Sequence, residues 1–116
     1  MFRESSSNEG KKKMVENLDA KTFENRLRED EKGILIDVRT PMEHQLARIP
    51  DSKLIDIASP FFITELDKLD RSGNYYLYCR SGNRSYFAGM QMLKMGFENV
   101  CHLQPGIIGW KGKTEQ

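Results

Sequence analysis

The sequence predicts a single α/β domain with a five-stranded, mostly parallel sheet that is flanked by helices on both faces. Short apolar runs alternate along the chain with amphipathic stretches, which is typical of strands and helices that follow one another in a parallel sheet. Five of these runs have the length of a strand. The length of 116 residues, of which 38% are hydrophobic, suits one core.

The N-terminal third is expected to supply a tail, an edge strand and a helix. Residues 1–13 are rich in Ser, Glu and Lys and predict a disordered tail, so the folded domain is expected over 14–116. Met14–Leu18 is a candidate edge strand. Asp19 is a candidate N-cap for an amphipathic helix near 20–31.

The middle of the chain carries two strand patterns and two helix-start signals. The β-branched run Ile34–Val38 predicts a strand buried on both faces. A capping box begun by Thr40 predicts a short helix from Pro41 to Ala47. Leu54–Ile57 reads as a short strand, and Ser59 followed by proline predicts the start of a second helix.

The last third is expected to place a cysteine between a strand and a helix. The aromatic run Tyr75–Cys79 predicts a strand that ends in the cysteine, and a polar loop follows it. A Met-rich helix is expected from Tyr86 to Met95, where Gly96 ends it, and a last strand covers Val100–Leu103.

The position of Cys79 predicts an anion site. In open α/β sheets, ligands bind beyond the carboxyl ends of the strands, where the next helix presents unpaired N–H groups and the positive end of its dipole. The small polar residues at 81–83 allow the backbone to curl so that its N–H groups converge, and Gly82 can adopt a positive φ. We therefore expect a cradle that stabilises negative charge.

The charge distribution supports that interpretation. The formal net charge is +1, yet no acidic residue lies between Asp70 and Glu98, whereas Arg80 and Arg84 lie inside that interval. These groups are expected to lower the pKa of Cys79 and to make its thiolate reactive. The alternative is that Cys79 merely fills the buried end of a strand.

Two segments together resemble the motifs of single-domain rhodaneses, which are thiosulfate sulfurtransferases. One is IDVRTP at residues 36–41 followed by Glu43, and the other is CRSGNRS at residues 79–85. The segments RIPDS at 48–52 and PGIIGW at 105–110 resemble two further family segments. They depart from them at four positions: Arg48 where histidine is usual, Asp51 and Ser52 where Gly-Ala is usual, and Pro105 where glycine is usual.

The resemblance implies a rhodanese-like fold and a two-step transfer of sulfur. The thiolate of Cys79, the catalytic residue, would attack the sulfane sulfur of thiosulfate, release sulfite and hold a persulfide until a thiol or cyanide accepts the sulfur. This chemistry needs no metal or organic cofactor. The substrate-binding residues would be Arg80, Ser81, Gly82, Asn83, Arg84 and Ser85.

Three charged residues of the first motif are interpreted as structural support for the site. Asp37 ends the buried strand, and Arg39 and Glu43 are predicted to form an ion pair across the strand end and the following helix. His44, which stands where the family often has an aromatic residue, is expected on the surface.

Two other functions compete with a sulfurtransferase. A related phosphatase or arsenate reductase would have five residues between cysteine and arginine, but only four separate Cys79 from Arg84, so the loop should enclose a smaller group. A sulfur carrier or sensing module would hand its persulfide to a specific protein, and the same loop would serve it. Turnover with free thiols or cyanide separates the enzyme from the carrier.

The remaining expectations concern thiols, partners and location. Cys101 is interpreted as a core residue, although the spacing leaves a disulfide with Cys79 open. Cys101 and His102 are adjacent on a strand and point to opposite sides, so a shared zinc is not expected. Two cysteines and no apolar signal segment favour the cytoplasm. Neither a nucleic-acid nor a membrane partner is expected, because the net charge is low and no apolar run could span a bilayer.

Overall fold

The computed structural model describes residues 14–116, so the predicted tail at 1–13 lies outside the described residues. Five strands form one sheet in the order β2-β6-β5-β3-β4, and every pairing is parallel. The sheet is thus wholly parallel rather than mostly parallel. The strands are β2 (Glu16–Leu18), β3 (Gly33–Asp37), β4 (Lys53–Leu54), β5 (Asn74–Tyr78) and β6 (Asn99–Leu103). The helices are α2 (Ala20–Glu29), α3 (Pro41–Leu46), α4 (Phe62–Asp67), α5 (Asn83–Lys94) and the 3₁₀ turn η2 (Ile107–Gly109).

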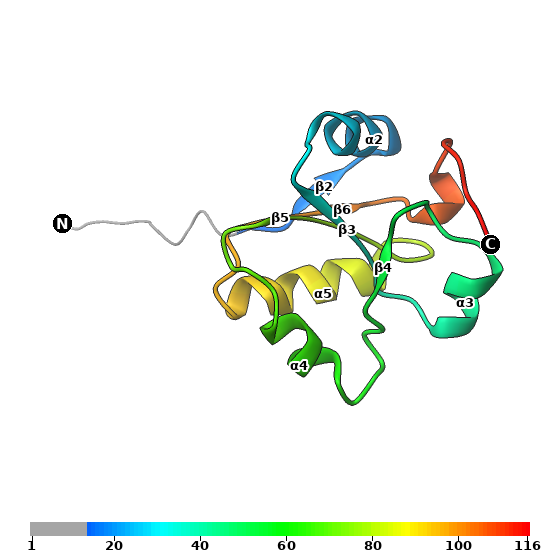
Figure 1. Cartoon of the computed structure of the whole chain (residues 1–116). Helices are drawn as coiled ribbons and strands as arrows, with labels where there is room; N and C mark the ends of the chain where they lie inside the picture. Colours follow the sequence, from blue (N-terminus) through cyan, green and yellow to red (C-terminus); the bar gives the residue numbers. More distant parts are fainter. Residues whose placement is uncertain (1–13) are drawn as a thin grey trace.

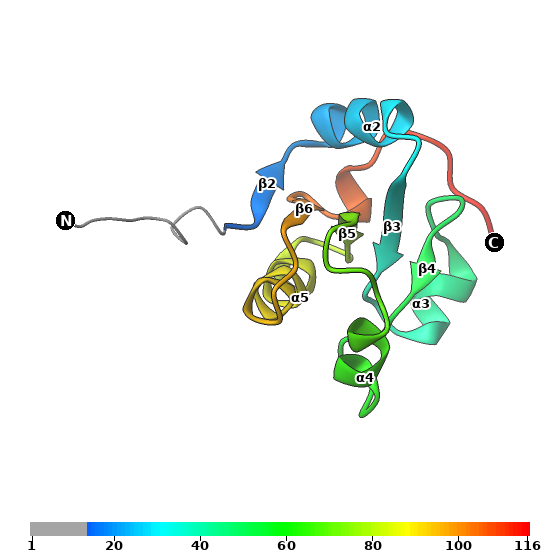
Figure 2. The same cartoon turned by 60° about the vertical axis from the view of Figure 1, so that its left-hand side comes forward.

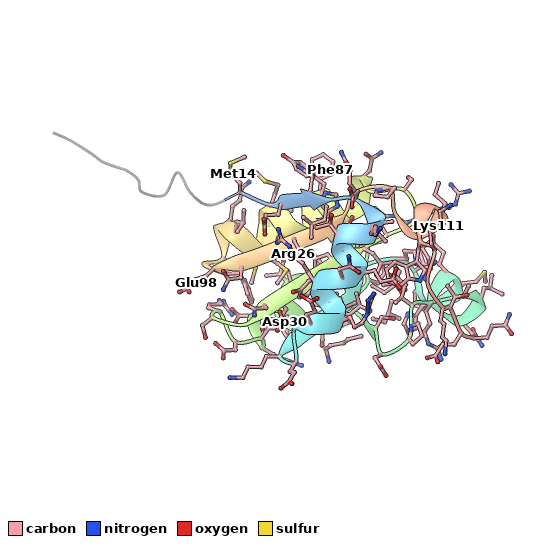
Figure 3. All side chains as sticks on the ribbon, turned by 90° about the horizontal axis from the view of Figure 1, so that it is seen from above. Met14, Arg26, Asp30, Phe87, Glu98 and Lys111 are labelled. Atoms are coloured by element: carbon pink, nitrogen blue, oxygen red, sulfur yellow. The ribbon has the colours of Figure 1, made fainter. Side chains whose placement is uncertain are left out.

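Helices cover both faces of the sheet, as predicted. In Figure 1, α2 lies above the sheet and α4 and α5 lie below it, and the turned view in Figure 2 shows the same layers. Seen from above, α2 crosses the sheet, with Arg26 on the helix and Asp30 at its C-terminal end (Figure 3). Among the described residues, no helix is long and apolar enough to cross a membrane.

Alternation along the strands produces two buried clusters. Ile36 and Leu77 contribute to the cluster that α4 and α5 cover, whereas Leu35 and Tyr76 contribute to the cluster under α2. Phe23 of α2 packs edge to face on Tyr76, with ring centroids 5.7 Å apart. Because both faces of the sheet are buried, the strands consist of continuous apolar runs rather than alternating apolar and polar residues.

Most element bounds differ from the prediction by one or two residues, and three of the differences have a local cause. Helix α5 begins at Asn83 instead of Tyr86, inside the polar loop. Helix α4 begins at Phe62, because Ser59 Oγ accepts a hydrogen bond from the Phe61 N–H, 3.0 Å away, and closes a turn before the helix. Strand β4 ends at Leu54 because the Asp56 side chain then accepts the Ala58 N–H and turns the chain.

Because all strands run in one direction, their carboxyl ends share one edge of the sheet. The Val38 N–H donates to the Tyr78 carbonyl at 3.0 Å, so the chain leaving β3 and the chain leaving β5 emerge side by side. The β5–α5 loop and α3 lie at this edge (Figure 1). The fold therefore brings together the two segments at residues 36–43 and 79–85.

Candidate active site

The thiol of Cys79 lies inside a ring of backbone amides at the start of α5. Its Sγ accepts the N–H groups of Gly82 at 3.1 Å and Ser85 at 3.4 Å. Gly82, the N-cap, has a φ of 105°, and it has no side chain to cap the helix. Sulfur therefore takes the place of the missing cap and accepts N–H groups that the first turn leaves unpaired. The predicted cradle and the predicted positive φ are both confirmed.

The cradle favours the thiolate. Burial raises the pKa of Cys79, but the hydrogen bonds from the Ser85 hydroxyl and from the N–H groups of Ser85, Gly82 and Ser81 outweigh burial and leave the pKa below its ordinary value. The Ser85 hydroxyl oxygen is 3.5 Å from Sγ. Hydrogen bonds, more than the predicted charges of Arg80 and Arg84, produce this shift.

The 3₁₀ turn η2 holds the start of the cysteine loop through backbone hydrogen bonds. The Ile107 N–H donates to the carbonyl of Cys79 at 2.9 Å, and the Ile108 N–H donates to the carbonyl of Arg80 at 3.3 Å. Gly106, with a φ of 74°, lies so close that a Cβ there would collide with the Arg80 carbonyl. These contacts were not predicted from the sequence, although Gly106 could have indicated a close approach of the backbone at this position.

The predicted ion pair between Arg39 and Glu43 is wrong, because each residue has another partner. Glu43 pairs with Arg84 through two hydrogen bonds, of 2.8 and 2.9 Å, and so links α3 to the cysteine loop. Arg39 instead pairs with Asp37. Arg84 is therefore occupied, whereas the exposed side chain of Arg80 makes no hydrogen bond or ion pair with any residue of 14–116.

The Glu43→Gln substitution should destabilise the protein by about 1 kcal/mol at pH 7. The loss is modest because the side chains of Glu43 and Arg84 are 28% and 35% exposed, so water partly screens the ion pair. The Arg84 hydrogen bonds hold the pKa of Glu43 at about 2. A pKa lowered by folding contributes stability above the unfolded value of 4.5, and that contribution is lost as the pH falls toward 2. Urea unfolding of both proteins between pH 7 and pH 3 measures the shrinking difference.

The matched control for that substitution is Glu65→Gln, which removes only an exposed pair with Lys68. It should leave the unfolding curve unchanged. A large loss of sulfur-transfer rate in Glu43→Gln at unchanged stability would contradict the supporting role of Glu43.

Asp37 is the centre of a buried polar network beneath α3. Its carboxylate is fully buried and accepts bonds from the Arg39 guanidinium at 2.8 and 2.9 Å and from the Tyr78 hydroxyl at 3.1 Å. His44 Nδ1 lies 2.8 Å from the same carboxylate. The expectation of a surface His44 is thus wrong. Arg39 also donates to the Ala47 carbonyl at 2.6 Å, which fixes the end of α3.

A second chain of hydrogen-bonded polar residues lies beside the cysteine, and it was not predicted from the sequence. His102, on β6, is buried, and its Nδ1 is 2.8 Å from the Ser85 hydroxyl oxygen. Its Nε2 is 2.6 Å from the side-chain oxygen of Asn17 on β2. The register of β2 and β6 places Asn17 opposite His102.

The other thiol belongs to the opposite face of the sheet. Cys101 lies in the apolar cluster under α2, whereas Cys79 lies in the cluster with α5, and both are free. Burial raises the pKa of Cys101 to about 12, which makes it an inert core residue as predicted. Among residues 14–116, no group of three His, Cys, Asp or Glu side chains is arranged to hold a metal.

The fold and the site define a class: a parallel α/β domain that holds one cysteine in an amide cradle at the carboxyl edge of its sheet. The rhodanese-like domain family matches residues 19–113. A sulfurtransferase of Allochromatium vinosum is 32% identical over 97 residues, which cover 84% of this chain and 89% of that protein. The chain belongs to the rhodanese-like domain family.

Other comparisons agree with this assignment. The Bacillus subtilis protein YrkF, provisionally described as a sulfur carrier protein, is 31% identical over 87% of this chain and 54% of its own length. The crystal structure of SSP1007 from Staphylococcus saprophyticus superposes with a TM-score of 0.77 at 19% identity, covering 88% of this chain and all of that one. A rhodanese-like domain from Anabaena gives a TM-score of 0.76 at 24% identity, covering 88% of this chain and 80% of that one. These two structures show the shared fold.

The four positions at which this chain departs from the two further family segments make no hydrogen bond to the thiol. Asp51, which replaces the usual glycine, has a φ of 67°, a conformation that aspartate tolerates better than most residues. Ser52 uses its hydroxyl to contact the Tyr78 hydroxyl at 3.1 Å. The amide cradle around Cys79 involves none of the four.

Proposed function

We propose that the protein is a rhodanese-like sulfurtransferase that carries a sulfane sulfur on Cys79. The observation that carries this proposal is the convergence of backbone N–H groups on Sγ, with the thiol pKa lowered by them. A cradle of this kind stabilises a thiolate before the transfer and a persulfide anion after it. The similarity to the sulfurtransferase of Allochromatium vinosum supports the same chemistry.

Thiosulfate is the proposed donor. The Cys79 thiolate attacks the outer sulfur, the sulfur–sulfur bond of the donor breaks, and sulfite leaves with the bonding pair. The negative charge then rests on the persulfide, within reach of the amides of residues 81–85. Arg80 is exposed beside the loop and suits the anionic donor, whereas Arg84 is engaged by Glu43 and acts by holding the loop. A thiol or cyanide takes the sulfur in the second step.

Incubation with thiosulfate should add the mass of one sulfur atom to the intact protein, and cyanide or dithiothreitol should then remove it. The reason is that a covalent persulfide survives until a thiophilic acceptor attacks it. Intact-mass spectrometry of the purified protein measures both steps. A protein that gains no mass from thiosulfate or from a low-molecular-weight persulfide would contradict the proposal.

The alternative is a carrier that passes its persulfide to one protein, and one feature of the surface favours it. The three elements next to the loop each expose an apolar side chain: Met42 on α3, Phe87 on α5 and Ile108 on η2 are 70%, 65% and 63% exposed. Fast turnover with cyanide or small thiols would identify the enzyme, and transfer only to a protein would identify the carrier. Either role suits a reducing compartment such as the cytoplasm, where Cys79 stays reduced.

A further inference from the structure

The proposed sulfur transfer leaves one buried polar group without a role. His102 is 2% exposed, and it lies on the face of β6 that packs against α5. A buried imidazole with a polar partner on each nitrogen is costly to maintain unless both partners are fixed. Here the partners lead in two directions, to Ser85 beside the thiol and to Asn17 at the edge of the sheet.

The partners determine which nitrogen carries the proton. The side-chain oxygen of Asn17 accepts only, so the 2.6 Å contact places a proton on Nε2 of His102. In the neutral ring, Nδ1 is then an acceptor. It takes the hydroxyl proton of Ser85 at 2.8 Å, a shorter contact than the 3.3 Å from the same hydroxyl to the Gly82 carbonyl. The Ser85 oxygen is left to accept the S–H of Cys79. The hydrogen bonds thus run in one direction: the thiol donates to the Ser85 hydroxyl, and the hydroxyl donates to the His102 imidazole.

We propose that His102 is the terminal acceptor of the Cys79 proton, which it reaches through the Ser85 hydroxyl. The inference rests on the proposed role of Cys79. The hydrogen bonds of His102 go to Ser85 and Asn17 and not to Sγ, and it is therefore a positioning residue that acts through Ser85.

The proton transfer balances in two coupled moves. The Cys79 S–H bond breaks and its proton forms an O–H bond with Ser85, while the original Ser85 hydroxyl proton passes to Nδ1 of His102. The products are a thiolate and an imidazolium, with the Ser85 hydroxyl now donating to sulfur. No other reactant is required. The same donor then faces the persulfide anion.

The surroundings of His102 suit a group that is neutral until the thiol ionises. Burial lowers the pKa of His102, so the imidazolium is unfavourable unless a compensating negative charge forms nearby. Asn17 of β2 and Ser85 of α5 face the His102 ring, and Cys79 lies beyond Ser85. The Tyr86 ring of α5 also faces it, with its centroid 5.9 Å from that of the His102 ring. Of these groups, Cys79 is the one that gains a negative charge when it ionises.

The test measures the rate at which iodoacetamide alkylates Cys79 as a function of pH, in wild type and His102→Gln. Glutamine can still accept a hydrogen bond from Ser85, but it cannot hold the proton. We expect the apparent pKa of Cys79 to rise by about one unit, which slows alkylation about tenfold below that pKa. Superimposable profiles in two equally folded proteins would overturn the proposal. Cys101 contributes little background, because its pKa is raised to about 12.

The Asn17→Asp variant separates a relay from a simple charge effect. A carboxylate facing Nε2 stabilises the imidazolium, so a relay predicts a lower apparent pKa for Cys79. Added negative charge without a relay would raise that pKa, because it disfavours the thiolate. Asn17 is exposed, which favours folding of this variant. A raised pKa in Asn17→Asp would overturn the proposal.

A third measurement uses the unaltered protein and covers the case in which His102→Gln fails to fold. The chain has two histidines, so their ring protons can be assigned by NMR with a His44 variant. The His102 titration should move to lower pH when Cys79 is alkylated, since the thiolate no longer compensates the imidazolium. An unchanged titration would contradict the relay. None of these readouts requires a sulfur donor, so a failed relay and a failed sulfur transfer give different results.

Discussion

The Cys79→Ser variant should form no persulfide with any donor and should lose sulfur transfer by on the order of 10⁴-fold or more, because the covalent intermediate has no sulfur to form on. Its fold should persist. The serine oxygen can accept the same N–H groups of Gly82 and Ser85 that now point to Sγ. Intact mass after thiosulfate treatment, together with a thermal unfolding curve, measures both expectations.

The matched control is Cys101→Ser, which alters the other buried thiol. Cys101 is buried in the apolar cluster under α2, and placing a polar hydroxyl there should cost about 1–3 kcal/mol of stability. It should nevertheless take up sulfur like the wild type. The less stable variant would thus be the active one. Residual persulfide in Cys79→Ser would refute the assignment of Cys79.

The fold was largely predictable because its signals are local. Continuous apolar runs at β3 and β5 indicated strands buried on both faces, and the clusters on the two sides of the sheet confirm that. The starts of helices were harder to place. Ser59 is a residue type that often caps helices, but here its side chain closes a turn before α4. Helix α5 begins earlier than predicted because a sulfur atom, rather than a side-chain oxygen, accepts its first N–H groups.

The cysteine loop was predictable for the same reason, since seven consecutive residues contain both the thiol and its amides. The ion pairs could not be predicted in the same way. Arg39 and Glu43 lie four positions apart, which invites a pairing, but the parallel sheet brings Arg84 to Glu43 from 41 residues away. His102 could not be placed either, because its contact with Ser85 depends on the register between strands and on the face to which each side chain points.

The two carboxylates of the first motif divide the support of the site between them. Glu43 connects α3 to the cysteine loop, while Asp37 connects α3 to the end of β3. A change at Asp37 should therefore reach the loop through α3, although Asp37 does not contact the thiol. The size of that effect depends on what remains buried once the carboxylate is removed.

The Asp37→Ala variant should lose about 3–5 kcal/mol of stability, because it leaves the buried Arg39 guanidinium without its carboxylate. This is a large part of the roughly 5–15 kcal/mol that stabilises a typical domain. Asp51→Asn is the matched control. Its side chain is exposed and its φ of 67° suits asparagine, so stability should change by less than about 0.5 kcal/mol. Urea unfolding at pH 7 measures both.

The pH dependence of Asp37→Asn tests the charge of the network apart from its shape. Burial raises the pKa of Asp37, but the hydrogen bonds from Arg39 and His44 outweigh it and leave the pKa below 3.8. Since folding lowers this pKa, the carboxylate contributes stability above about pH 4 and loses that contribution as the pH falls through its folded value. The stability difference between wild type and Asp37→Asn should therefore be largest near neutral pH and shrink below pH 4. A difference that stays constant down to pH 3 would show that Asp37 acts through packing, and the ion pair with Arg39 would then contribute nothing measurable.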